Sequence, residues 1–543
     1  MQVTPVLIAG GGPVGMTLAY DLARRGVPCV LVERNSATTR HPKMDITNGR
    51  SMELFRRAGL AVALRAAAVP EENPFDVSWI TSLAGYELHR FRYPSVVQDR
   101  LRIRDNNDGT QSREPGMRVS QVEIEPVLKA AIDNAPAVDV RFGVEFVSLQ
   151  QDAAGVTAQL RHVRDQRLET IRCQYVVGCD GGTSAVRDCL DIALSGTARI
   201  MSRFMTHFHS DATGLLQRWG LAWHYQSVHG TLIAQNDKDI WTLHSRFPQG
   251  RAPEDVDPQA LLTRFAGTSF AYEILVANHW TPHLLVADSY GKGRVLLAGD
   301  AAHQYIPTGA YGMNTGIGDA FDLGWKLAAV LGGFGGPKLI AAYDCERRPI
   351  GVRNRDASAR HNDVRVEIGR LYDERLEAET SDGERARAHA SKRIAELGNA
   401  ENECRGIEFG YAYQASPIVL REPNCAAPDD ILHYHPTTVP GVRLPSVFLD
   451  DGSALFDRLG SWFSLLVFGD RDPSAFVSAA KATRVPLALL RIGTPELEPI
   501  FEAGMVLVRP DQHVAWRGNR IADERSASTV LRTALGWPSD ADS

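Results

Sequence analysis

The first residues that could do chemistry form a glycine-rich turn near the start of the chain, Gly10-Gly11-Gly12-Pro13-Val14-Gly15. The turn follows a short apolar run at residues 6–9 and precedes a helix-like pattern at residues 14–25. Gly10 allows a tight turn, Gly12 lets the backbone approach a pyrophosphate, and Gly15 lets the helix pack closely on the strand. The free N–H groups at the start of that helix would face the phosphates.

A carboxylate follows the glycine turn at the spacing expected for a residue that binds a ribose. Residues 30–33 form a second apolar run, and Glu33 ends it about twenty residues after the glycine turn. At that position a carboxylate accepts hydrogen bonds from ribose hydroxyls, and the neighbouring Arg34 belongs to the same binding unit. Because strand, turn, helix, strand and acid follow in order, residues 3–33 indicate a dinucleotide-binding βαβ unit rather than a purely structural turn.

Two later segments predict that the dinucleotide is a flavin. Asp180 and Asp300 each follow an apolar run, and residues 312–316 open a pattern with helical spacing. A flavin needs an acceptor for its ribityl hydroxyls, which Asp300 can supply. The N1/O2 edge of the ring needs positive potential when it is reduced. Backbone N–H groups of Gly312, Met313 and Asn314 can provide it through the helix dipole.

In this order, the motifs resemble those of the flavoprotein aromatic hydroxylases that share the para-hydroxybenzoate hydroxylase fold. The closest likeness is to the phenol hydroxylase branch, which carries an extra C-terminal thioredoxin-like domain. Its members show GxGxxG, then DGxxSxVR, then GRVxLAGDAAH with PxxGxGMNxGIxDAxNLxWKL. Their counterparts are residues 10–15, 180–187, 293–303 and 307–327. The likeness covers nearly the whole chain and is weaker at residues 445–469 and 504–516.

The resemblance implies an α/β fold with three parts: a Rossmann-like FAD-binding domain, an interleaved β-sheet substrate domain and a C-terminal thioredoxin-like domain. The expected FAD-binding parts are residues 1–75, 118–190 and 291–415, the last with a helical region. The expected substrate-domain parts are residues 76–117 and 191–290. Residues 416–543 would form a linker and the C-terminal domain. No cysteine follows Cys425, so redox exchange in that domain is excluded.

The resemblance also implies the reaction. FAD reduced by NADPH or NADH would react with dioxygen to give a flavin C4a-hydroperoxide, which hydroxylates a small phenolic substrate, as in the catabolism of aromatic compounds. Asp180 would lie in an element linked to FAD and nicotinamide binding. Arg50 and Gln121 match family positions near the flavin, and Pro307 begins the segment on the peroxide side, where it is a candidate for catalysis.

Asp45 is the candidate for helping to deprotonate the phenol. In the phenol hydroxylase branch an acid or a histidine precedes the same Asn/Arg stretch, which is residues 48–50 here. The alternative is a solvated aspartate that caps a turn. Other side chains that could reach a phenolic oxygen are His224, Tyr225 and Tyr311.

Composition narrows the class of protein. The net charge of the 543 residues is only −6, so no basic field recruits nucleic acid. The 7 cysteines are scattered without metal spacing, which favours a reduced chain without a structural metal. No signal sequence and no apolar run of about twenty residues occur, so we expect a cytoplasmic protein that does not bind a membrane. Family habit suggests a homodimer.

Other functions stay open at this point. An oxygenase of the same fold could act on a polyketide or an antibiotic, including by Baeyer–Villiger insertion, and pocket size would discriminate between the two. A flavin reductase or a halogenase-like relative is a further alternative, although the lysine-bearing motif of halogenases is not evident. The choice between NADH and NADPH and the position of hydroxylation also stay open.

Overall fold

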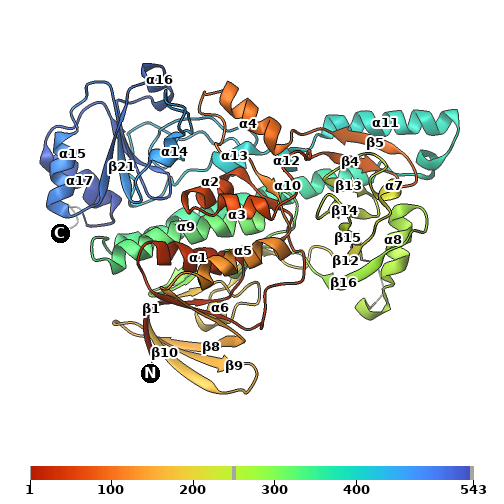
Figure 1. Ribbon diagram of the computed structural model, residues 1–543, viewed down its shortest axis with the longest axis horizontal. Helices are drawn as coiled ribbons and strands as arrows, with labels where there is room; N and C mark the ends of the chain where they lie inside the picture. Colours follow the sequence, from red (N-terminus) through yellow and green to blue (C-terminus); the bar gives the residue numbers. More distant parts are fainter. Residues whose placement is uncertain (1, 248–251, 539–543) are drawn as a thin grey trace.

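A mainly parallel sheet forms the centre of the flavin-binding region. The computed structural model describes residues 2–247 and 252–538 (Figure 1). Strand β1 (Gln2–Ala9) pairs in parallel with β2 (Cys29–Glu33) on one side and β10 (Leu168–Gly178) on the other. The sheet continues to β7 (Val138–Phe142) and to β19 (Val295–Leu297). Its central strands are buried on both faces, which explains their nearly continuous runs of Val, Leu and Ile.

Two helices pack together on this sheet at unusually short range. Helix α1 (Pro13–Arg24) follows the glycine turn, and helix α9 (Tyr311–Leu331) lies against it. A Cβ atom on Gly324 of α9 would come within 2.3 Å of a carboxylate oxygen of Asp21 on α1. The glycines of α9 therefore do not break the helix, because they let the two helices approach one another.

A second sheet of seven strands forms the substrate domain, seen at the right of Figure 1. In spatial order its strands are β16 (Glu273–Trp280), β12 (Arg203–His209), β15 (Ile240–Arg246), β14 (Gly230–Ala234), β13 (His224–Ser227), β4 (Val77–Ile80) and β5 (Glu87–Phe91). One face packs on helix α8 (Pro258–Ala266) and buries Tyr225 and Trp241. These two aromatic residues are therefore core, and the opposite face is turned towards other parts of the chain.

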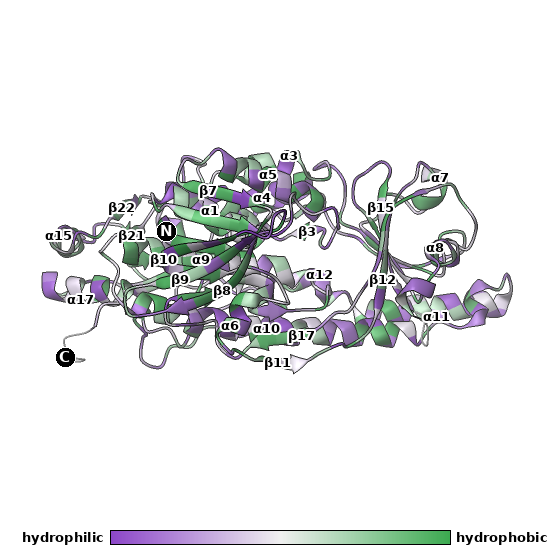
Figure 2. Ribbon diagram, turned by 90° about the horizontal axis from the view of Figure 1, so that it is seen from below, coloured by the Kyte–Doolittle hydropathy of each residue, from purple (hydrophilic) through white to green (hydrophobic). Residues whose placement is uncertain are grey.

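Two further helices connect the domains. Helix α10 (Lys338–Gly369) begins beside the C-terminal domain, where the N–H of Lys338 donates to the carbonyl of Gly536 (3.0 Å). It ends near the substrate sheet. Helix α11 (Ser381–Leu397) then lies beside β5 at the edge of that sheet (Figure 1), where its Ala390 and Ile394 are buried. The ribbon of α11 in Figure 2 carries both hydrophilic and hydrophobic residues. Residues 361–405 are therefore divided among several helices, and one side of α11 is buried.

The C-terminal domain has its own four-stranded sheet, at the left of Figure 1. Strand β21 (Phe463–Phe468) pairs in parallel with β22 (Leu487–Ile492) and antiparallel with β23 (Met505–Val508), which pairs with β24 (Val514–Gly518). Helices α15 (Ser474–Thr483) and α17 (Glu524–Ala534) complete it. This layout and the parallel sheet confirm the predicted fold class. No helix in residues 2–247 or 252–538 is long and apolar enough to cross a membrane.

Candidate active site

The glycine-rich turn joins the end of β1 to the start of α1. Gly10 has a φ of +110°, and a Cβ atom there would lie 2.2 Å from the carbonyl oxygen of Cys179. A Cβ atom on Gly15 would lie 2.0 Å from the carbonyl oxygen of Gly10. At Gly12 no atom lies within 4 Å of the corresponding position. The backbone around Gly12 is therefore open to a phosphate, while the other two glycines are required by the packing.

The carboxylate predicted to meet the ribose lies beside this turn. Glu33 accepts the backbone N–H of Gly11 through Oε2 (2.8 Å) and that of Asn35 through Oε1 (2.8 Å). Oε1 also accepts the side-chain amide of Asn35 (2.6 Å), so it is Oε2 that keeps acceptor capacity for a ribose hydroxyl. The next residue, Arg34, is exposed.

Asp180 and Asp300 lie at the same edge of the parallel sheet. The strands that precede them are neighbours, since the N–H of Ala298 donates to the carbonyl of Gly178 (2.9 Å). Asp180 accepts the hydroxyl of Ser184 (2.5 Å), and burial raises the pKa of its carboxyl group. The Asp300 side chain is exposed and makes no hydrogen bond within the described ranges. It is thus free to accept the hydroxyls of a bound ribityl chain.

The N-terminus of α9 faces the same region. The side chain of Asn314 accepts the N–H of Asn48 (3.0 Å) and donates to the carbonyl of Ile46 (3.1 Å). Its amide is therefore occupied by the protein. The first N–H groups of a helix have no partner within the helix, so the backbone at Gly312, Met313 and Asn314 can serve the flavin ring. No atom stands within 4 Å of a Cβ position on Gly312.

Two other predicted residues border this region. Gln121 begins helix α5 (Gln121–Asp133), and its N–H donates to the carbonyl of Met44 (3.2 Å). Its side-chain amide donates to Glu125 (2.7 Å). Pro307 is exposed in the loop before α9, where its carbonyl accepts the N–H of Ala310 (2.9 Å). Pro307 thus lies just before α9 in the chain. Gln121 is hydrogen-bonded to Met44, two residues before Ile46, which binds Asn314 of α9.

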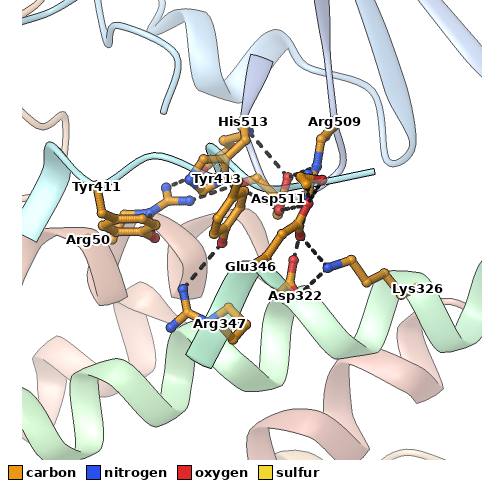
Figure 3. A network of polar contacts seen from close by, with 12 residues as sticks. Arg50, Asp322, Lys326, Glu346, Arg347, Tyr411, Tyr413, Arg509, Asp511 and His513 are labelled. Atoms are coloured by element: carbon orange, nitrogen blue, oxygen red, sulfur yellow. Dashed lines mark hydrogen bonds and ion pairs between the residues drawn. The ribbon is translucent and has the colours of Figure 1, made fainter. Parts of the chain in front are cut away.

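The side chain of Arg50 reaches the C-terminal domain. It lies on helix α2 (Gly49–Arg57), but its guanidinium points towards the C-terminal domain (Figure 3). Nη2 donates to the carbonyl of Asp511 (2.7 Å), Nη1 donates to the side chain of Gln512, and Nε donates to the hydroxyl of Tyr411 (3.3 Å). The structure therefore places the guanidinium of Arg50 in the domain interface, while its neighbours Asn48 and Ser51 contact Asn314 at the start of α9.

The same interface contains a buried ionic network that sequence reasoning missed (Figure 3). Arg509 of the C-terminal domain donates to both carboxylate oxygens of Glu346 on α10 (2.5 and 2.8 Å). It also reaches Asp322 on α9 (3.2 Å). Both acids contact Lys326 as well. Four fully buried charged side chains thus join the last domain to the two long helices of the flavin-binding region, and no local sequence pattern indicates this pairing.

Asp45 lies between the flavin motifs and the substrate sheet. It immediately precedes the short strand β3 (Ile46–Thr47), whose Ile46 carbonyl binds Asn314. One oxygen of Asp45, Oδ2, accepts hydrogen bonds from the indole of Trp223 (2.6 Å) and from Nε2 of His224 (3.0 Å). Burial opposes ionisation, but the hydrogen bonds and charge around Asp45 lower its pKa overall. Asp45 is therefore an ionised, mostly buried acceptor and not a solvated turn cap.

The pairing of the strands shows which face of the substrate sheet Asp45 meets. His224 on β13 stands opposite Ile233 on β14, which stands opposite Thr242 on β15. Residues directly opposite one another point to the same side of a sheet. Since His224 contacts Asp45, this side faces the flavin-binding region.

That face carries buried polar atoms without a partner. Within the described part of the chain, these atoms are Nδ1 of His224, Oε1 of Gln226, Nδ1 of His244, Oδ1 of Asn278 and Nε1 of Trp280. Buried polar groups in proteins are nearly always hydrogen-bonded, so a cluster of unpartnered ones needs an explanation. A bound molecule with several polar groups would satisfy them.

A site suited to a flavin dinucleotide and a sheet whose polar face is turned towards it are the features of a flavoprotein oxidoreductase. Comparison with known families agrees with this class. Residues 3–358 match the FAD binding domain family, and residues 437–538 match the C-terminal domain of aromatic-ring hydroxylases. The chain therefore belongs to the FAD-dependent aromatic-ring hydroxylases, it is a monooxygenase, and FAD is its cofactor.

Individual relatives cover nearly the whole chain. A protein of Emericella nidulans named FAD-dependent monooxygenase apdD is 35% identical over 98% of this chain and 90% of its own length. Phenol 2-monooxygenase of a Pseudomonas strain is 28% identical over 96% of this chain and 91% of its own. The flavin-dependent monooxygenase PieE, solved with FAD and substrate, superposes with a TM-score of 0.89 at 30% identity, covering 99% of each chain.

Proposed function

We propose that the protein hydroxylates a phenolic ring and that NADPH or NADH supplies the electrons. When bound, FAD supplies the activation of dioxygen for transfer of one oxygen atom to the ring. The observation that carries the proposal is the contact between Asp45 and His224, located between the N-terminus of α9 and the substrate sheet. The similarity to phenol 2-monooxygenase supports the phenolic class.

The pair has the arrangement of a proton acceptor held by a carboxylate. With Nε2 of His224 donating to Asp45, a neutral imidazole carries its lone pair on Nδ1. That atom is buried, has no partner in the described residues and lies on the sheet face turned to the flavin-binding region. His224 therefore takes the phenolic proton in our proposal, and Asp45 holds the ring in position and stabilises its protonated form. An ionised phenol pushes electron density into the ring, which makes a ring carbon easier to oxygenate.

A second candidate substrate is a larger polyketide-type molecule with several oxygen atoms. The unpartnered atoms of Gln226, His244 and Asn278 favour it, because a simple phenol with one hydroxyl would leave most of them unsatisfied. Both candidates use the same proton acceptor, so they differ in the size of the substrate and in the number of polar contacts.

The test is to follow NADPH and NADH consumption, oxygen uptake and product mass with the FAD-loaded enzyme. The panel holds simple phenols and polycyclic phenols with several oxygens. We expect at least one to accelerate oxidation and to gain one oxygen atom. A panel that yields no oxygenated product would count against the proposal. Phenols that stimulate oxidation but yield only peroxide would point to the larger class of substrate.

A variant pair tests the proton acceptor. His224→Gln should lower kcat by about 10² or more, the usual contribution of a general base. Raising the pH towards the phenol pKa of about 10 should restore part of the rate, since the substrate then ionises unaided. The control is His209→Gln, which removes a half-exposed histidine from β12 in the same sheet. Equal kcat values and equal pH profiles for the two variants would exclude His224 as the acceptor.

A further inference from the structure

A cavity of about 200 Å³ lies between helix α2 and the C-terminal domain. Its lining includes Arg24, Arg57, Arg113 and Gln512. Arg24 is the last residue of α1, whose first turn holds the phosphate-binding glycines. A helix of 12 residues is about 18 Å long. The cavity is therefore at the opposite end of α1 from the dinucleotide phosphates, and it is distinct from the flavin site.

Two guanidinium groups on this cavity lack a carboxylate partner. Neither Arg57 nor Arg113 forms an ion pair in the described part of the chain, and the Nε atom of each is buried without a hydrogen bond. Arg57 donates only to the carbonyl of Gly460 (2.5 Å), and Arg113 contacts the ring of Phe448 (5.3 Å). Burial and the neighbouring Arg25 and Arg24 lower the pKa of Arg57 to about 9. An uncompensated buried cation is costly unless an anion pairs with it.

The acids around the cavity are already neutralised. Glu53 is paired with Arg443, and Asp457 is held by two nitrogens of Arg56 (2.7 Å each). Glu114, which borders the adjoining cavity, is paired with Arg65 (2.8 Å). These carboxylates are engaged by other arginines, so they offset the charge of Arg113 only in part, and neither Arg57 nor Arg113 has a carboxylate of its own.

Gln512 provides an independent sign that this cavity suits a ligand. Its side chain is fully buried, and Oε1 accepts a hydrogen bond from Arg50. Its Nε2 group has no partner among the described residues. A buried amide donor next to two guanidinium groups without acceptors makes a set of donors that only an acceptor-rich ligand would satisfy.

A second cavity of about 280 Å³ adjoins the first and shares Arg56 and Arg113 with it. It adds Arg100 and Arg104 from helix α4 (Val96–Asp105). The two cavities together give room for a molecule larger than a single small anion, with cationic groups along its length.

We propose that the cavity beside α2 binds a phosphate group through Arg57, Arg113 and Gln512. A phosphate dianion matches the two uncompensated charges, and its oxygens accept from guanidinium and amide donors. Free inorganic phosphate and a nucleotide phosphate present the same group. The 2′-phosphate of NADP⁺ is the nucleotide source that the adjoining cavity would accommodate.

The primary test uses the FAD-loaded full chain. Tm and calorimetric titration are compared in sodium phosphate and in sodium chloride of equal ionic strength. Phosphate should raise Tm by a few degrees at saturating concentration, since binding to the native state stabilises it. Arg57→Gln and Arg113→Gln should each weaken phosphate binding about tenfold or more. The control Arg102→Gln removes an exposed arginine of α4 (63% side-chain exposure) and should leave binding unchanged.

The result that overturns the proposal is a Tm rise no larger in phosphate than in chloride, or phosphate binding that both cavity variants retain. If Arg57→Gln does not fold, the phosphate binding of Arg113→Gln alone tests the proposal. Titration with NADP⁺ and NAD⁺ then identifies the source. NADP⁺ that competes with phosphate, where NAD⁺ does not, assigns the group to the nucleotide. Nucleotide binding without competition assigns the site to free phosphate.

Discussion

Asn314 at the start of α9 accepts the backbone N–H of Asn48 at the start of α2, over 3.0 Å. The same amide donates to the carbonyl of Ile46 (3.1 Å). One side chain therefore holds the helix opening that serves the flavin and the segment that carries Asp45. The position of Asp45 relative to the start of α9 depends on this connection.

Replacing Asn314 should damage catalysis more than folding. Asn314→Ala leaves the N–H of Asn48 and the carbonyl of Ile46 unpaired, at a cost of about 1–3 kcal/mol each when such groups are buried. We expect lower kcat and a larger share of reduced nicotinamide spent on peroxide, because Asp45 loses its support. Asn134→Ala, at the exposed end of α5, is the control and should leave product yield unchanged. Equal coupling in the two variants would contradict the assigned role.

The pH dependence of the free energy of unfolding should reveal the protonation of His244. Burial lowers the pKa of His244 to about 4, whereas an unfolded histidine has a pKa of 6.5. Between these values the unfolded chain binds more protons than the folded one, so stability falls as the pH drops. From pH 7 to pH 5 this residue should contribute a loss of roughly 2 kcal/mol. His513, whose pKa burial also lowers to about 4, adds its own share.

Urea denaturation at the two pH values, for the wild type and for His244→Asn, measures the share of His244. The variant keeps His513 and should lose only part of the pH dependence. His209→Asn serves as the half-exposed control. An unchanged difference between pH 7 and pH 5 in His244→Asn would show that this histidine titrates normally.

Gly15→Ala should abolish FAD binding. The new Cβ atom would lie 2.0 Å from the carbonyl oxygen of Gly10, which is backbone and cannot move aside without opening the turn. Overpacking of this kind costs about 1–3 kcal/mol or more. Gly214→Ala, where no atom stands within 4 Å, is the matched control. Flavin absorbance after desalting gives the comparison, and yellow Gly15→Ala protein would disprove the close approach.

Arg509 should be among the most sensitive residues for stability. Arg509→Met leaves Glu346 and Asp322 buried with only Lys326 to neutralise them. Breaking a buried ionic network by removing one partner costs about 3–5 kcal/mol. Arg471→Met breaks a half-exposed pair with Glu498 and should cost less than about 1 kcal/mol. The free energies of unfolding from urea titrations should therefore differ several-fold.

The sequence predicted the features that depend on a local pattern of residues. The glycine turn and the acids at strand ends occupy neighbouring positions because parallel strands end at one edge of a sheet. The family likeness predicted the fold class, including the C-terminal domain. Helix α9 begins at Tyr311, one residue before the segment 312–316 that we expected to open a helix. Glycines look unfavourable for a helix in sequence, and close packing explains them here: Gly316 and Gly324 face α1, and Gly318 faces Arg347 of α10.

The sequence did not predict contacts between residues that lie far apart in the chain. Asp45 and His224 are separated by 179 positions, and Arg50 and Asp511 by 461. No periodicity links such residues, because the contact exists only after three domains have assembled. The guanidinium of Arg50 binds a backbone carbonyl and two neutral side chains of distant segments, besides its ion pair with Glu53 one helical turn away (3.2 Å).

The buried bond between Arg509 and Glu346 has a consequence for how the protein is made. Arg509 is in the last tenth of the chain, whereas the acids it neutralises lie in the two helices that complete the flavin-binding region. A ribosome therefore releases those helices, with Lys326 as the only cation of the network, before Arg509 is made. We expect FAD to bind only after translation is complete. A chain truncated before Arg509 should therefore not bind added FAD.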